Sequence, residues 1–227
     1  MVSENSAASR PSSGASSDPD TARRFLRAAA GVELLGGLSF FAGVSRPVVF
    51  EMFALTADRA HKIAIAMGNP SEVTLAWALM GIGFILMGLG LGLWGWTAAR
   101  LETGRRAVAT RVIGVTAAIG GFGPGLVRLV TPFVSLEQAA VEEGALKVFF
   151  GVGSLGLLVG FIGLGVLTWR GPAPRWLGVF LALMGLLGAV TLIPAWWMIG
   201  ALVFGLVGVI HFRRSWPRKA YRPAPTT

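Results

Sequence analysis

Long apolar segments separated by short polar or basic stretches dominate the hydrophobic pattern of the chain. Six of them cover approximately residues 28–44, 75–96, 112–134, 148–169, 176–193 and 195–212. A helix that crosses the hydrocarbon core of a bilayer needs about 20 apolar residues, with a range of about 17–25. The pattern therefore predicts an all-α membrane protein, a bundle of six transmembrane helices. The first and the last two segments are near the short end of that range.

Capping signals and prolines locate several helix ends more sharply than the apolar segments do. The stretch NPSE, Asn69 to Glu72, places Asn at the N-cap, Pro at the first helical position and Glu three residues after the cap. The stretch SLEQ, Ser135 to Gln138, is a capping box that predicts the start of the helix carrying the fourth span. Pro194 separates the last two segments and predicts a tight hairpin rather than one bent helix.

Residues 46–68 connect the first two spans and show a helical pattern. Asp58 and Lys62 are spaced for an i,i+4 ion pair on a polar face that also holds Glu51. Another face repeats apolar or small residues at three- and four-residue intervals: Phe50, Phe53, Ala57, Ala60 and Ala64. We therefore expect a short extracytoplasmic amphipathic helix that lies on the membrane surface or caps the bundle.

Polar stretches flank the apolar region. Residues 1–22 predict a disordered cytoplasmic tail and residues 215–227 a basic cytoplasmic tail, which leaves residues 23–214 as the transmembrane domain. The stretch RRFLR, Arg23 to Arg27, raises the alternative of a twin-arginine export signal, whose cleavage would leave five spans. No A-x-A cleavage site follows, and Glu33 within the apolar segment is unusual for a signal.

The composition favours burial in lipid over a water-soluble core. Of 227 residues, 54% are hydrophobic and 14% are charged, against roughly 25% charged residues in a typical soluble domain. A formal charge of +9 would raise the question of nucleic acid in a soluble protein. Here the basic residues lie between and after the apolar segments, so we expect a membrane and no nucleic acid as partner. The chain has no cysteine, which excludes disulfides, thiolate metal sites and cysteine nucleophiles.

The distribution of basic residues predicts the orientation of the spans. If six spans alternate in direction, fifteen Lys and Arg residues fall on one side and five on the other. The positive-inside rule makes the basic side cytoplasmic, so both termini are expected in the cytoplasm, next to anionic lipid. The Arg-, Ala- and Gly-rich usage favours the cytoplasmic membrane of a bacterium. Tryptophans are expected at the two interfaces: Trp77, Trp196 and Trp197 outside, and Trp94, Trp96, Trp169 and Trp176 inside.

Ionisable residues lie inside two predicted spans, Glu33 in the first and Arg128 in the third. Such residues cost about 2.5–3.5 kcal/mol on insertion scales and are functional hypotheses by default. Because the depths of the two differ, we expect Glu33 to meet Arg111 at the inner end of the third span. Arg128 is expected to extend outward to an acidic partner; the choice is open among Glu51, Glu137, Glu142 and Glu143. Either such pairs fix the helix arrangement, or Glu33 is a carboxylate that binds a proton or a cation.

Other patterns that carry chemistry are weak. His61 and His211 fall at opposite ends of the spans, so no metal site is expected, and no cofactor motif is found. Glu142 and Glu143 are neighbours on a helix and point about 100° apart, which favours a solvated acidic face over a catalytic pair. The sequence holds no nucleophile elbow, Walker lysine or convincing Ser–His arrangement.

The glycine-rich stretch GGFGPGLVRLV, Gly120 to Val130, has the look of a phosphate loop but lies inside the third apolar segment. It lacks the Walker lysine and the G-x-G-x-x-G spacing. Gly121 and Gly125 permit close helix packing, and Pro124 is expected to kink the helix. The same small-xxx-small spacing recurs at Gly88/Gly92, Gly156/Gly160 and Ala201/Gly205. These faces serve either packing within the chain, or docking of a second copy or another membrane protein.

Three functions follow from these patterns. A non-enzymatic accessory or scaffold protein is the first, because catalytic groups are lacking, small-residue faces recur and the loops are short. A small transporter or channel that uses Glu33 is the alternative, and a lipid-active membrane enzyme is a weaker one. A water-filled cavity that reaches Glu33 would favour transport, whereas a dry interior would favour the accessory role.

Overall fold

The computed structural model describes residues 19–52, 58–100, 102–141, 145–170, 175–191 and 195–211. These residues form helices joined by short connections, with no strand among them, which confirms the all-α prediction. The helices are α1 Pro19–Val44, α2 Pro47–Met52, α3 Arg59–Gly68, α4 Pro70–Arg100, α5 Gly104–Val134, α6 Leu136–Val141, α7 Ala145–Arg170, α8 Arg175–Thr191 and α9 Ala195–His211.

Three helical segments in the described part of the chain are long and apolar enough to cross a membrane: Arg24–Val44, Pro70–Arg100 and Gly104–Val134. Shorter apolar stretches follow at Leu155–Val166, Arg175–Gly188 and Trp196–Ile210. Each predicted span therefore lies on a different helix, and the first three have the length that a crossing requires.

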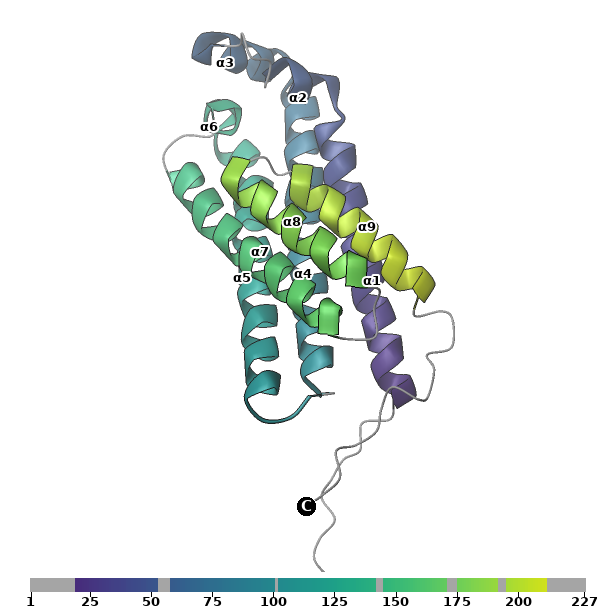
Figure 1. Cartoon of the computed structure of the whole chain (residues 1–227). Helices are drawn as coiled ribbons and strands as arrows, with labels where there is room; N and C mark the ends of the chain where they lie inside the picture. Colours follow the sequence, from purple (N-terminus) through teal and green to yellow (C-terminus); the bar gives the residue numbers. More distant parts are fainter. Residues whose placement is uncertain are drawn as a thin grey trace, which may run out of the picture.

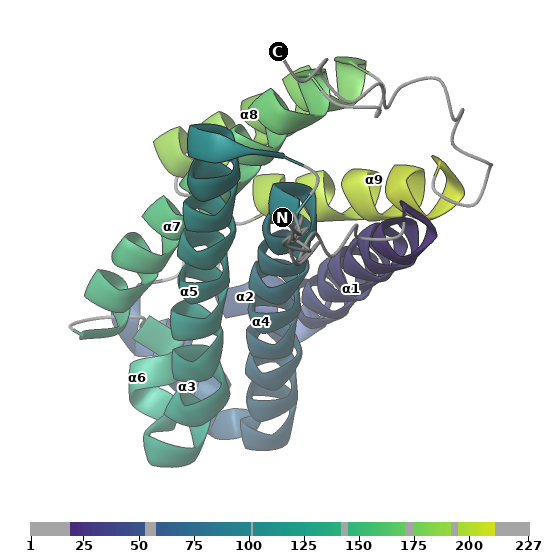
Figure 2. The ribbon, with the colours of Figure 1, turned by 90° about the horizontal axis from the view of Figure 1, so that it is seen from below.

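The six apolar helices pack in a closed order (Figure 2). α4 lies between α1 and α5, α7 lies between α5 and α8, and α9 packs against both α8 and α1. Large apolar side chains fill the space that they enclose. The ring of Phe84 on α4 has its centroid 5.0 Å from that of Phe40 on α1 and 6.5 Å from that of Trp197 on α9. The core is thus shared by helices from both halves of the chain.

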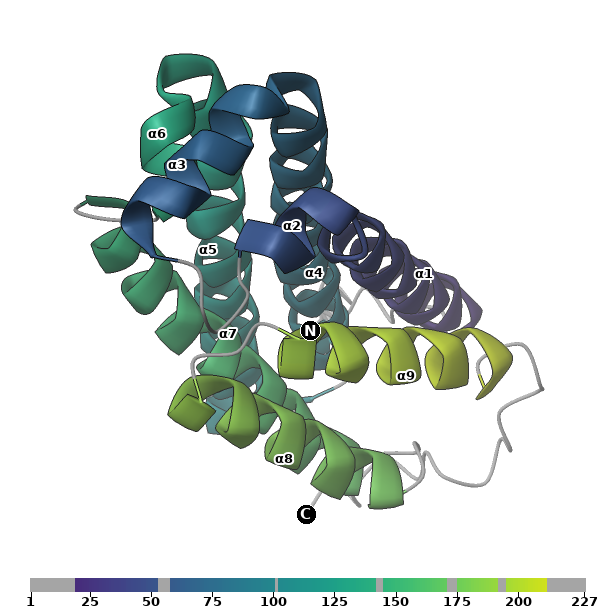
Figure 3. The same ribbon diagram turned by 90° about the horizontal axis from the view of Figure 1, so that it is seen from above.

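The three short helices gather at one end of the molecule, above α4 and α5 in Figure 1 and nearest the viewer in Figure 3. The start of α1 and the turn from α4 to α5 lie at the other end. α3 packs against α2 and α6, and Arg59 of α3 lies 3.8 Å from Glu137 of α6. Arg46 lies 3.1 Å from Glu72 and so joins the turn after α1 to the start of α4.

Residues 46–68 do not form one amphipathic helix as predicted, because the extended backbone of Asp58 makes α3 a helix separate from α2. Residues 53–57 lie outside the described part. Asp58 begins the second helix: its Oδ1 accepts a hydrogen bond from the backbone N–H of His61 at 2.7 Å. Such a cap satisfies an N–H group that has no partner within the helix. α2 buries Val48, Val49 and Met52, whereas Phe50 of the predicted apolar face is 63% exposed.

Two of the predicted helix starts are confirmed. α4 begins at Pro70, and Ser135 precedes α6 and accepts a hydrogen bond at its Oγ from the N–H of Gln138 at 3.2 Å. Ser135 does not open the helix of the fourth span, however, because α6 ends at Val141 and α7 begins at Ala145. α8 and α9 are separate helices that diverge from neighbouring ends (Figure 3), whereas Pro194, where the hairpin is predicted, lies outside the described residues.

Small residues let the helices approach closely. A Cβ atom on Gly88 would lie 2.8 Å from the Cα atom of Gly121, and one on Gly156 would lie 2.6 Å from that of Gly120. In the Ala201/Gly205 pair, a Cβ atom on Gly205 would lie 2.6 Å from the Cβ atom of Leu34 on α1. The predicted small-xxx-small faces are thus occupied by the chain's own helices.

Candidate functional site

Glu33 lies near the middle of α1, on the face that packs against α4, and its exposed fraction is 0%. Gly90 stands opposite. A Cβ atom at that position would lie 2.6 Å from Cγ and 3.0 Å from the carboxyl carbon of Glu33. Because Gly90 has no side chain, the carboxyl group of Glu33 can occupy the volume next to it.

The surroundings of this carboxyl group are apolar side chains and helix backbone. The backbone of Leu91 lies close to it, but neither carboxyl oxygen makes a hydrogen bond of good geometry with a described residue. The two helices that pack on α1 carry no ionisable residue over 73–99 of α4 and 195–210 of α9. Glu33 is thus an isolated ionisable group where these three helices meet.

The predicted pair between Glu33 and Arg111 does not form. Arg111 is exposed on α5, and its guanidinium carbon lies 5.6 Å from the ring centroid of Trp96. α1 and α5 pack on different faces of α4 (Figure 2), so a residue at the right depth on α5 still points away from Glu33. Depth can be counted along the sequence, but the direction in which a residue faces its neighbours cannot.

Arg128 is buried on α5, at 7% exposed, and its guanidinium group lies against aromatic rings of α4. Its guanidinium carbon is 5.2 Å from the ring centroid of Trp77 and 5.7 Å from that of Phe84, and Nη1 is 3.8 Å from Sδ of Met80. Cation–π contacts with Trp and Phe stabilise a guanidinium group away from water. Trp77 and Phe84 are seven residues apart and so share one helix face, a pattern that is visible in the sequence.

Some of the predicted interface tryptophans lie in the interior. Trp77 is 1% exposed, Trp94 is 5% exposed and Trp197 is 0% exposed. Trp96 and Trp176, at 49% and 54%, are the exposed members of the predicted inner set that the structure describes. Three of these tryptophans therefore pack the core, and the position of Trp96 and Trp176 at an interface stays a prediction.

The acidic residues predicted as partners of Arg128 lie at different positions, and the two that the structure describes are not paired with it. Glu137 lies 3.8 Å from Arg59, Glu51 is exposed on α2, and Glu142 and Glu143 lie outside the described residues. Of the ion pairs given above for this end, Arg59–Glu137 joins α3 to α6, and Arg46–Glu72 joins the turn after α1 to α4. Exposed pairs of this kind contribute about 0–1 kcal/mol each, so they orient the short helices more than they stabilise the fold.

The helix packing predicted around Pro124 is present. Gly121 and Gly125 face α4, where Cβ atoms would lie 2.5 Å from the Cα atom of Gly88 and 2.6 Å from the carbonyl oxygen of Gly81. Pro124 is buried within α5, which continues through it, and contacts Gly153 of α7. The expected kink at Pro124 stays a prediction.

A buried carboxyl group of this kind can take up or release a proton only when water or another carrier reaches it. Glu33 is 0% exposed, so its carboxyl group is closed off from solvent. The described residues contain no group of three or more His, Asp or Glu side chains placed to hold a metal ion. The arrangement therefore offers proton chemistry at one position.

Comparison with protein-family models, with curated proteins and with solved structures finds no match to this chain.

Proposed function

We propose that the chain is an integral membrane protein in which α1, α4, α5, α7, α8 and α9 all cross the cytoplasmic membrane of a bacterium, with both termini in the cytoplasm. α8 and α9 have 17 residues each, about 25 Å at 1.5 Å per residue, and thinning of the bilayer accommodates the shortfall from about 30 Å. The exposed arginines at the start of α1 and at the α4–α5 turn lie at one end of the molecule, which supports the orientation.

Within the membrane we propose a non-enzymatic accessory or scaffold role. The observation that carries this proposal is the dry, closed packing around Glu33, which shows 0% exposure. A transport pathway needs water or substrate to reach such a group, and the described core around it is filled by apolar side chains. The small-residue faces no longer support the proposal, since the chain's own helices cover them; a partner must use other surfaces.

Purification from native membranes in a mild detergent tests the accessory role. We expect one or more membrane proteins to remain with the tagged chain through size exclusion, in a fixed ratio measured by quantitative mass spectrometry. A tagged, unrelated polytopic protein from the same membranes is the control for detergent-driven association. A homogeneous monomer that carries no partner would contradict the role.

A proton-linked transporter or channel is the second candidate. It is favoured because Glu33 has no cationic partner among the described residues. An ion pair that fixes the helices would have given this buried carboxyl group a structural role, and without it a functional role is the remaining explanation. Proton or solute flux into liposomes should fall at least tenfold in Glu33→Gln if the group couples transport, while the exposed Glu51→Gln serves as the matched control. Unchanged flux in Glu33→Gln would remove this candidate. No described feature favours a lipid-active enzyme.

A further inference from the structure

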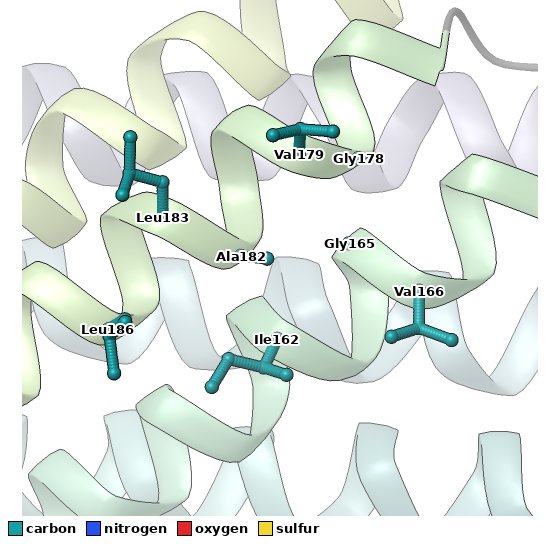
Figure 4. Close-up of a pocket in the computed structure, with 8 residues that line it drawn as sticks. All are labelled: Ile162, Gly165, Val166, Gly178, Val179, Ala182, Leu183 and Leu186. Atoms are coloured by element: carbon teal, nitrogen blue, oxygen red, sulfur yellow. The ribbon is translucent and has the colours of Figure 1, made fainter.

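An apolar groove lies between α7 and α8 on the outer surface of the helix assembly (Figure 4). Its volume is about 660 Å³, and the side chains of Val166, Val179, Leu183 and Leu186 that line it are 47–51% exposed. Gly165, Gly178 and Ala182 leave the space between these rims. The lining therefore recognises hydrocarbon and offers it no hydrogen-bonding side chain.

A positive charge marks one end of the groove. Arg175 is the first residue of α8 and is exposed. Arg175, Val179, Ala182 and Leu186 follow at intervals of four, three and four residues, so all four lie on one face of the helix. Trp176, beside Arg175, is 54% exposed, as expected of an indole at the level of lipid headgroups.

The dimensions of the groove match one lipid chain. Arg175 and Leu186 are eleven residues apart on α8, about 16 Å at 1.5 Å per residue. Half of a hydrocarbon core about 30 Å thick is about 15 Å, the reach of an acyl chain within its own leaflet.

We propose that this groove binds one anionic phospholipid, whose acyl chain lies along Val179, Ala182 and Leu186 and whose phosphate contacts Arg175. The exposed guanidinium group of Arg175 favours an anionic over a zwitterionic headgroup. The inference requires that α7 and α8 lie in the bilayer, but it does not depend on whether the protein is an accessory subunit or a transporter.

Native mass spectrometry of the full chain, released from nanodiscs of equal parts phosphatidylglycerol and phosphatidylcholine, tests the proposal. We expect the wild type to retain phosphatidylglycerol about fivefold more than phosphatidylcholine, and Arg175→Gln to lose that preference, since one Arg near an anionic headgroup is worth about that factor. The matched control Arg106→Gln removes an exposed arginine of α5 that does not line the groove and should retain the wild-type preference.

A second pair of variants tests the groove itself. Val179→Trp places an indole in the groove and should remove both retained lipids, whereas Leu206→Trp, at a position 53% exposed on α9, should leave them. Equal retention of the two lipids by the wild type, or the same loss in Arg106→Gln as in Arg175→Gln, would overturn the proposal. So would a dimer that Val179→Trp separates, because a second copy would then occupy the face. Lipid retention is read separately from co-purifying proteins, so a failure here leaves the accessory role standing.

Discussion

Gly90 and Glu33 depend on each other, because the carboxyl group fills the volume that a side chain at position 90 would need. Gly90→Ala should destabilise the protein by about 1–3 kcal/mol, the usual cost of overpacking, since the new Cβ atom would lie 2.6 Å from Cγ of Glu33. Part of that cost should disappear when Glu33→Ala is made in the same chain. Unfolding in mixed detergent micelles, compared across the two single variants and the double variant, measures this coupling.

Gly31→Ala provides the control for that experiment. Gly31 lies on the same helix as Glu33 and would place its Cβ atom in open space, so the substitution should be neutral or stabilising by up to about 1 kcal/mol. Equal losses from Gly90→Ala with and without the Glu33 side chain would show that the backbone contact alone sets the packing.

The guanidinium group of Arg128 contacts the individual rings of Trp77 and Phe84. Arg128→Met keeps an unbranched apolar side chain but removes the guanidinium group, and should cost about 1–2 kcal/mol through the loss of cation–π attraction away from water. In a Trp77→Leu background the cost should be smaller by about 1 kcal/mol, which a double-mutant cycle on thermal unfolding in detergent measures. Equal costs in both backgrounds would assign the contribution of Arg128 to other contacts.

The sequence identified both charged residues but neither of their environments. A single Glu or Arg inside an apolar segment is visible by inspection, and its depth can be counted. Its partner depends on helix rotation, because successive residues turn by about 100°. Arg111 has a suitable depth but lies on α5, across α4 from Glu33, and the rings around Arg128 became evident only when α4 and α5 were brought together.

Local capping determines how the chain between the first two spans divides. Asp58→Ala should destabilise α3 by about 1 kcal/mol, the typical cost of losing an N-cap, because the N–H of His61 would lose its acceptor. Hydrogen exchange of the first amides of α3 should accelerate about fivefold, while those of α4 stay unchanged. Glu51→Ala, which removes an exposed acidic side chain on α2, is the control; equal acceleration in both variants would contradict a capping role.

Helix ends were predictable where the signal lay beside a break in the apolar pattern. Asn69 to Glu72 stood directly before a long apolar run, and α4 begins there at Pro70. The three- and four-residue spacing of small residues continues past Asp58, so the pattern places Asp58 on the polar face of a helix, whereas in the structure it is the N-cap of α3. Ser135 caps α6 as its capping-box pattern predicts, whereas the segment between α6 and α7 lies outside the described residues.

At the scale of the whole molecule, segment length and polarity were enough to predict the apolar helices, but not their order in space. α4 carries two rows of glycine at seven-residue spacing: Gly81, Gly88 and Gly95 face α5, and Gly83 and Gly90 face α1. The rows can be read from the sequence, whereas the neighbour that each row meets cannot. The closed order through α9 back to α1 depends on such contacts between segments that are far apart in the chain.

The orientation of the helices can be tested because the chain contains no native cysteine, so single-cysteine variants need no prior substitutions. Ser71 and Gln138 lie at the end that carries the short helices, Val190 lies near the C-terminal end of α8, Thr103 lies just before α5, and Arg175 is the first residue of α8; all five are exposed. In intact cells, a membrane-impermeant maleimide should label cysteine at the first three positions, because they face outward. It should label the other two only after permeabilisation. Protection of Val190→Cys alone would mean that α8 and α9 do not cross, and labelling of Thr103→Cys in intact cells would contradict the crossing of α4 and α5 in the proposed direction.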